Sequence, residues 1–326
     1  MKKIHVCAIL LFLILTPCAN AQQLPLYSQY MFNRFLINPA VAGSDGYTSI
    51  NLTAREQWIG IEKSPKTHSL SYQTRILKRS YIIKSTKVRR KTYKPSTKGR
   101  VGVGGYIFDD RNGLVSRTGF QLTYAYHIWM EETQLSFGLS GTAFQFRIND
   151  EGLTFFEPEE PLLNGDLRKT MFIPDANFGV YLLNSRYSIG FSVSQLFQSY
   201  LKIGNAGLSD YRMLRHYYLS GEYIFPLQNE FSFKPSVLIK TTEELLYQID
   251  FSAKVQYRGD YWAGLSYRTA GAVVLIAGMR FDKYYFGYAF DYTLSSIMKH
   301  SIGSHEFMMA VKFGDSARRF RWIDRY

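Results

Sequence analysis

Two-residue alternation of apolar and polar side chains recurs along this chain from about residue 48 to residue 313 and constrains its fold more than any other feature. In the window that begins at Tyr187, one face carries Tyr187, Ile189, Phe191 and Val193, and the other carries serine and glycine. Because successive side chains of a strand point to opposite faces, this period predicts strands with one apolar and one wet environment.

We predict about fourteen such strands, most of them about as long as the roughly 9 to 11 residues that a tilted strand needs to cross a bilayer. They begin near Thr48, Thr67, Arg100, Arg117, Gln134, Ala176, Arg186, His216, Glu230, Gln248, Asp260, Gly271, Lys283 and His305. A soluble sandwich would carry more charge on its wet faces, whereas these faces are small and polar. The predicted fold is therefore an all-β, antiparallel transmembrane β-barrel spanning residues 47–313.

The lengths of the connections predict the direction of the strands. Barrels of bacterial outer membranes have short periplasmic turns and longer outer loops. The connections after even-numbered strands are short, as at Leu183 to Arg186 and Arg258 to Asp260, with the one exception of Lys78 to Arg100 after the second strand. The long segments Asn149 to Pro174 and Phe197 to Arg215 fall on the other side. We therefore expect the first strand to run outward.

Residues 1–21 predict a secretory signal peptide. An apolar run follows Lys2 and Lys3 and ends in small residues before Gln22, where we expect cleavage. A lipoprotein signal is the alternative, but proline directly before Cys18 fits it poorly. Cys7 and Cys18 are the only cysteines and lie in this segment, so the mature chain is expected to have no disulfide and no cysteine chemistry.

Basic residues are concentrated in two segments on the predicted periplasmic side. The connection Lys78 to Arg100 contains ten Lys and Arg and no acid, and the tail 314–326 is also basic. These segments are either solvated loops or a docking surface for an acidic periplasmic partner or lipid head groups. Nucleic acid is not expected as a partner of an exported protein. The candidate docking residues are Arg89, Arg90, Lys91, Arg318, Arg319 and Arg321.

The segment 22–46 carries a dense pattern that is not strand-like. Ser28 can cap a short helix up to Phe35, and Asn38 before Pro39 ends it. We expect this helical segment to be a plug inside the barrel, and a position under the periplasmic mouth is the alternative. As a plug, its residues Asn33, Arg34 and Asn38 would pair with lumen charges such as Asp250 or Glu306. The candidate plug residues are Gln29, Tyr30, Met31, Phe32, Asn33, Asn38, Pro39 and Gly43.

The tetrad Gly303-Ser304-His305-Glu306 resembles a hydrolase site only superficially. Adjacent strand residues point to opposite faces, so Ser304 and His305 cannot form a nucleophile–base pair. The other histidines of the mature chain are single, without metal-ligand spacing. We therefore predict no catalytic residue, no cofactor and no metal, and the protein is not expected to be an enzyme.

An ordered set of motifs resembles the PorP/SprF family of outer-membrane proteins of type IX secretion and gliding motility. The motifs include LYSQYMFNRFLINPAVAG, VGVGGYIFDDRNG, RHYYLSGEY and GSHE, and the resemblance extends from Leu24 to Phe313. Departures are Val41, where the family usually has tyrosine, and the two basic segments.

This resemblance implies a non-enzymatic barrel in outer-membrane lipid that works with translocon components of type IX secretion. It implies binding or anchoring of a secreted cargo protein with a C-terminal sorting domain at the cell surface, together with a link to a periplasmic lipoprotein. We expect cargo at the outer loops, including Ser295 to Ser304. The alternative function is a plugged porin or passive transporter.

Overall fold

The computed structural model describes residues 27–76, 100–130, 132–148, 171–198, 200–201 and 211–313. The predicted signal peptide lies outside the described residues. So do both predicted basic docking segments, with Arg89, Arg90 and Lys91 in the first and Arg318, Arg319 and Arg321 in the second.

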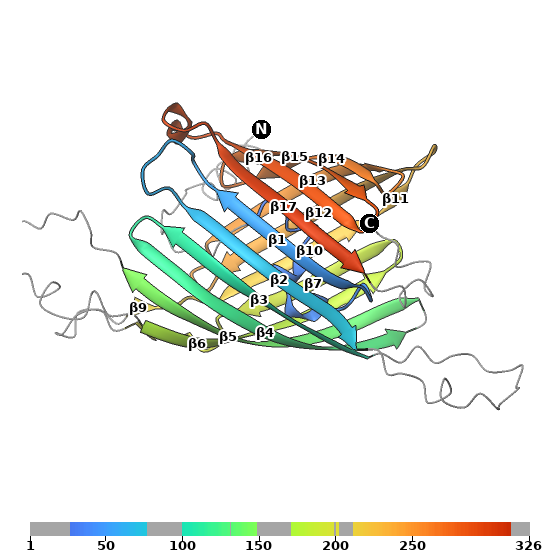
Figure 1. Ribbon diagram of the computed structural model, residues 1–326, viewed down its shortest axis with the longest axis horizontal. Helices are drawn as coiled ribbons and strands as arrows, with labels where there is room; N and C mark the ends of the chain where they lie inside the picture. The colour runs from blue at the N-terminus through green and yellow to red at the C-terminus, as the bar shows by residue number, and fades with distance from the viewer. Residues whose placement is uncertain are drawn as a thin grey trace, which may run out of the picture.

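Fourteen antiparallel strands form a closed barrel (Figure 1). Each strand pairs with its neighbours along the chain, β1 pairs with β17, and β10 pairs with β7 and β12, so the ring has no open edge. The predicted antiparallel barrel of about 14 strands is confirmed. The strands are β1 Thr48–Glu56, β2 Lys66–Ile76, β3 Val101–Asn112, β4 Val115–Met130, β5 Thr133–Ile148, β6 Met171–Asn184, β7 Tyr187–Ser194, β10 His216–Tyr223, β12 Phe231–Thr242, β13 Tyr247–Tyr257, β14 Tyr261–Arg268, β15 Ala272–Phe281, β16 Tyr284–Thr293 and β17 Ser304–Phe313.

The remaining elements are short. A two-residue strand, β11 (Phe225–Pro226), extends the pairing of β12, and β8 (Tyr200–Leu201) pairs with β9 (Tyr211–Arg212). The 3-10 turn η5 (Ser296–Lys299) lies between β16 and β17. No helix in the described parts of the chain is long and apolar enough to span a membrane.

The alternation in sequence places apolar side chains outside and polar ones inside. On β7, Phe191 is 42% exposed and Ser192 is 1% exposed, and on β13, Phe251 is 53% exposed next to the buried Asp250. A soluble protein would reverse this arrangement, whereas a membrane barrel requires it because its outer surface contacts lipid.

The two ends of the barrel differ in their connections. At one end, here called the short-turn end, the links are as short as Arg258 to Asp260 and Asp282 to Lys283, with Arg258, Gly259 and Asp282 at positive φ. At the other end, the long-loop end, β5 and β6 are joined by residues 149–170 and β16 and β17 by residues 294–303. β1 begins at the short-turn end.

β4 and β5 are 16 residues long and extend toward the long-loop end. At about 3.3 Å per residue and a tilt near 45°, such a strand rises roughly 37 Å, more than the roughly 30 Å of a hydrocarbon core. At this end Phe144 and Phe146 point inward and pack with Ile173 and Met213, while Gln145 and Arg147 are exposed outside. The expectation of a small, polar lumen is therefore wrong here, because the projecting wall encloses a small core of its own.

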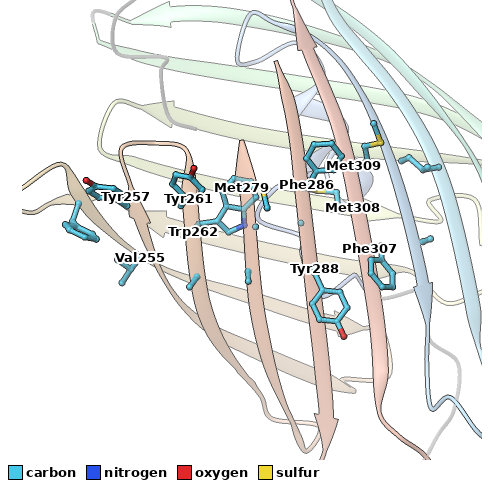
Figure 2. Close-up of a pocket in the computed structure, with 17 residues that line it drawn as sticks. Val255, Tyr257, Tyr261, Trp262, Met279, Phe286, Tyr288, Phe307, Met308 and Met309 are labelled. Atoms are coloured by element: carbon cyan, nitrogen blue, oxygen red, sulfur yellow. The ribbon is translucent and has the colours of Figure 1, made fainter. Parts of the chain in front are cut away.

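An apolar hollow of about 730 Å³ lies on the outward face of the sheet from β12 through β17 to β1 (Figure 2). Small outward residues, among them Ala263 and Ala277, leave space between Tyr261, Phe286 and Met309. On a membrane barrel this face contacts acyl chains. A functional site is therefore expected inside the barrel.

Candidate functional site: the N-terminal segment inside the barrel

Residues 27–46, here called the lumen segment, cross the interior of the barrel from one end to the other (Figure 1). The backbone N–H of Ser28 donates to Glu306 Oε2 at 2.7 Å, close to the long-loop end of β17. Lys312 Nζ lies 3.4 Å from Asp45 Oδ2, close to the short-turn end of the same strand. The chain therefore descends the whole lumen before β1 returns toward the long-loop end.

The lumen segment forms no α-helix, so the predicted helix from Ser28 to Phe35 is wrong. It contains turns and two 3-10 turns, η1 (Arg34–Leu36) and η2 (Pro39–Val41). Wall groups bond its backbone directly: Glu306 accepts two consecutive amides, and Ser192 Oγ donates to Ile37 O at 2.6 Å. These tertiary contacts override a weak local helix preference.

The part of the segment near the long-loop end is held by a cluster of buried charged and polar side chains, here called the anchor cluster. Glu306 is fully buried and accepts the N–H groups of Ser28 and Gln29 at 2.7 and 2.9 Å through its two carboxylate oxygens. Ser28 Oγ donates to Asp291 at 2.7 Å and accepts from Arg55 Nη1 at 2.6 Å. The anchor cluster consists of Ser28, Arg55, Asp250, Arg268, Asp291 and Glu306.

Ion pairs link the anchor cluster across five strands. Arg55 Nη2 lies 2.7 Å from Asp291 Oδ2, and Arg55 Nη1 lies 3.1 Å from Glu306 Oε2. Arg268 extends the chain, since it pairs with Asp291 and Asp250 at 3.1 Å each. Each charge is nearly inaccessible to water, so removal of one partner would leave another buried and uncompensated.

A second ion pair holds the segment to the opposite wall of the barrel. Arg34 Nη2 lies 2.7 Å from Glu222 Oε2 of β10, and Arg34 Nη1 donates to Tyr181 Oη and Ser188 Oγ at 2.8 Å. Arg34 thus pairs with a lumen charge, as expected, but the partner is Glu222 and not Asp250 or Glu306, because those carboxylates are satisfied by Arg268, Arg55 and the backbone.

The two asparagines of the segment bond neutral groups. Asn33 Nδ2 donates to Ser71 Oγ at 3.1 Å, and Asn38 Nδ2 donates to Val180 O at 3.0 Å. Asn38 Oδ1 also accepts the N–H of Ala40 at 2.9 Å and so caps η2 at Pro39. Neither asparagine bonds the lumen charges that we expected.

Apolar residues of the segment find a small core within the lumen. Tyr30 and Met31 pack among Trp262, Leu238 and Ile276, which point inward from β14, β12 and β15. The Tyr30 hydroxyl lies 3.3 Å from Ser236 Oγ. The Phe32 ring lies 4.8 Å from that of Trp262, with the ammonium group of Lys254 over it at 4.3 Å.

Glycines in the wall make room for the part of the segment near the short-turn end. A Cβ at Gly138 would overlap the backbone of Ala40, and one at Gly102 would overlap the carbonyl of Ala42. Gly43 (φ 66) donates its N–H to Gln73 Oε1 at 3.2 Å. Small lumen residues were visible in the sequence, whereas their contacts with the segment were not.

The tetrad near the start of β17 divides between the two faces. Ser304 accepts the N–H of Trp58 at 3.1 Å, and Glu306 belongs to the anchor cluster. His305 points to the other face, where its Nδ1 lies 2.7 Å from Tyr288 Oη. Gly303 adopts φ 102 and accepts the N–H of Ile59. Within the described residues, no group of three His, Asp or Glu side chains is arranged to hold a metal.

The chain matches the family described as type IX secretion system membrane protein PorP/SprF over residues 19–311. The chain belongs to the PorP/SprF family. It is thus a β-barrel membrane protein of type IX secretion. No curated protein matches it.

Solved barrels share little sequence with this PorP/SprF protein. A TodX monoaromatic hydrocarbon channel lacking S2 and S3 is 10% identical, with 86% of this chain and 93% of that chain covered and a TM-score of 0.42. BamA from Haemophilus ducreyi lacking POTRA domains 1–3 is 9% identical over 82% and 70% of the two chains, with a TM-score of 0.38. OmpF from Salmonella typhi in complex with daunomycin is 8% identical over 83% and 99%, with a TM-score of 0.31.

Proposed function

We propose that this PorP/SprF protein is a non-enzymatic outer-membrane component of type IX secretion that binds a secreted protein at the cell surface. The observation that carries the proposal is the lumen segment, which crosses the interior and is anchored by buried contacts at both ends. Two cavities that described residues line beside it, of about 90 and 20 Å³, are far smaller than an open channel. A filled barrel is suited to holding a partner and not to passing one through its lumen.

The long-loop end is the proposed cargo face. Short turns lie in the periplasm and long loops outside in barrels of this kind, so the long-loop end would face the medium. The projecting wall of β4 and β5 adds an inward-facing apolar cluster at this end, around Phe144 and Phe146. The proposed partner is a secreted protein with a C-terminal sorting domain.

The short-turn end is the proposed periplasmic face. In this proposal the signal peptide is cleaved before Gln22, where the mature chain begins. We assign to this face the contacts with translocon components and with a periplasmic lipoprotein. In the sequence, basic stretches around Arg89 and Arg319 follow β2 and β17, which end at this face, and a charge of that sign would suit an acidic partner.

Affinity capture from solubilised envelopes tests this function. Tagged protein in mild detergent should retain a protein with a C-terminal sorting domain together with a type IX secretion component. An unrelated barrel with the same tag is the control. Recovery of neither kind of protein would refute the proposal.

Liposome swelling distinguishes the competing function, a plugged porin or passive transporter. We expect the intact barrel to pass sugars no faster than empty liposomes, since the lumen segment fills the interior. Rapid swelling with the intact protein would favour the transporter. Deletion of residues 29–43 should raise the flux if the barrel still forms.

A further inference from the structure

A cavity of about 90 Å³ lies above the lumen segment, toward the long-loop end. Tyr27 and Ile37 of the segment form its floor, and inward residues of β3, β4, β5, β6, β7 and β10 form its walls. At roughly 30 Å³ of liquid volume per water molecule, it has room for about three waters or a side-chain head group of similar size. We call it the outer cavity.

Aromatic rings provide much of the wall of the outer cavity. The centroids of Tyr106 and Phe108 lie 5.9 Å apart, those of Phe108 and Phe144 lie 6.4 Å apart, and Tyr218 lines the cavity from β10. The faces of such rings attract cations and also pack against methylene groups. This wall suits a group that is apolar along its stem and positive at its tip.

A carboxylate with an unused oxygen lines the same cavity. Asp175 is 4% exposed, and its Oδ1 accepts the N–H groups of Ala176 and Phe197 at 2.7 and 3.0 Å. Its Oδ2 is buried and has no hydrogen-bond partner among the described residues. A buried carboxylate oxygen without a donor is costly, and a bound donor would remove that cost.

Two arginines near this end of the barrel are already engaged. Arg117 also lines the cavity, and its Nη2 lies 2.5 Å from Asp110 Oδ2. Arg215 Nη1 lies 3.0 Å from Glu243 Oε1, and its other nitrogens donate to Leu196 O. Asp175 therefore forms no ion pair within the described residues, and Arg215 is present only as a nearby charge.

We propose that the outer cavity binds a basic side chain, lysine or arginine, presented by a polypeptide at the long-loop end. The stem of that side chain lies against Phe144 and Tyr218, and its charged head donates to Asp175 Oδ2. This inference rests on the proposed function, since it specifies the chemistry by which the barrel holds a secreted protein.

Ligand-detected NMR of the full-length protein in detergent micelles tests the cavity directly. The probe is Nα-acetyl-arginine amide, and the control probe is its citrulline analogue, which has nearly the same shape and no charge. We expect at least tenfold weaker binding of the citrulline probe, because its urea group keeps N–H donors but lacks the positive charge that would pair with Asp175. Equal binding of the two probes would overturn the inference.

A conservative variant locates the binding. Asp175→Asn removes the charge while retaining an oxygen for the N–H groups of Ala176 and Phe197, and it should weaken arginine binding at least tenfold. Asp109→Asn is the matched control, because Asp109 lies at the same end of the barrel and pairs with Arg111 outside the cavity. Unchanged binding in Asp175→Asn, or equal loss in the control, would place the probe elsewhere.

Cargo capture separates this inference from the proposed function. If both hold, the arginine probe competes with a captured sorting domain and Asp175→Asn retains less of it. Capture that neither the probe nor the variant affects would refute the cavity as the cargo site and leave the proposed function intact. Arginine binding without any capture would contradict the proposed function and leave the basic-side-chain site standing.

Discussion

Replacement of Glu306 by glutamine should release the lumen segment from the wall of the barrel. Glu306 accepts the N–H groups of Ser28 and Gln29 and pairs with Arg55, all within 3.1 Å and out of contact with water. Glutamine has nearly the same shape, but it has one acceptor oxygen instead of two and no charge. One backbone N–H would face an NH₂ group, and Arg55 would lose one of its two carboxylates.

The expected cost follows from these contacts. Breaking a buried ion pair by removal of one partner costs about 3–5 kcal/mol. Since each 1.4 kcal/mol is a factor of ten, the fraction of molecules with a detached segment should rise roughly 100- to 4,000-fold. Asp291 remains as a partner of Arg55, so the lower part of this range is expected.

Cysteine accessibility measures the detached fraction. Both native cysteines lie in the predicted signal peptide, so Met31→Cys would give a single reporter in the buried lumen segment. The rate of maleimide labelling in detergent should rise at least roughly 100-fold when Glu306→Gln is added. This holds when the segment detaches and reattaches faster than the exposed cysteine reacts, so that the rate follows the detached fraction.

A surface carboxylate provides the control. Glu230 is 62% exposed and pairs with Arg258 in a turn, so Glu230→Gln should leave the labelling of Met31→Cys unchanged. Equal labelling rates with and without Glu306→Gln, in barrels with the same circular dichroism, would refute the anchoring role of Glu306.

Three further variants test the glycine contacts with the lumen segment, the ion pair between Arg34 and Glu222, and the lipid face. Gly138→Leu should expose the lumen segment to protease because its side chain overlaps the segment, whereas Gly141→Leu, with open space around its Cβ, should not. Arg34→Ala should lower the free energy of unfolding by about 3 kcal/mol, because the buried Glu222 loses its ion-pair partner while Lys254 and Lys234 remain as nearby charges. The Arg34→Met, Glu222→Leu double variant should recover most of that loss in urea titrations. Phe191→Arg should cost about 2–4 kcal/mol in lipid vesicles, since it places a charge on the lipid face, and a stability equal to wild type would contradict that assignment.

The sequence predicted the barrel well because lipid and lumen impose opposite polarity on alternate residues. Phe251 and Asp250 differ so strongly in polarity that their faces are unambiguous, and the starts of most strands follow from such pairs. Contacts across the lumen were not predictable in this way. Which carboxylate pairs with Arg34 depends on how deep each carboxylate lies in the barrel and on the path of the lumen segment. Neither property leaves a periodic pattern in the sequence.

Local signals also failed where tertiary contacts dominate. The stretch after Ser28 has an apolar pattern compatible with a helix, but Glu306 and Ser192 bond its backbone from the wall. The inward aromatics Phe144 and Phe146 were missed because the alternation was interpreted as lipid against water along the whole strand. The 16-residue length of β5 was the available sign that its end leaves the membrane.

The anchor cluster lies at the point where the barrel closes. Arg55 and Glu306 are directly opposed partners on β1 and β17, the first and last strands of the ring. Ser28 and Gln29 bond Glu306 from inside, and Ser28 also bonds Asp291 on β16. The same carboxylates thus balance the charge of Arg55 at the seam and hold the segment in the lumen. Docking of the segment and closure of the ring therefore stabilise each other, so the segment is better described as part of the wall than as a free gate.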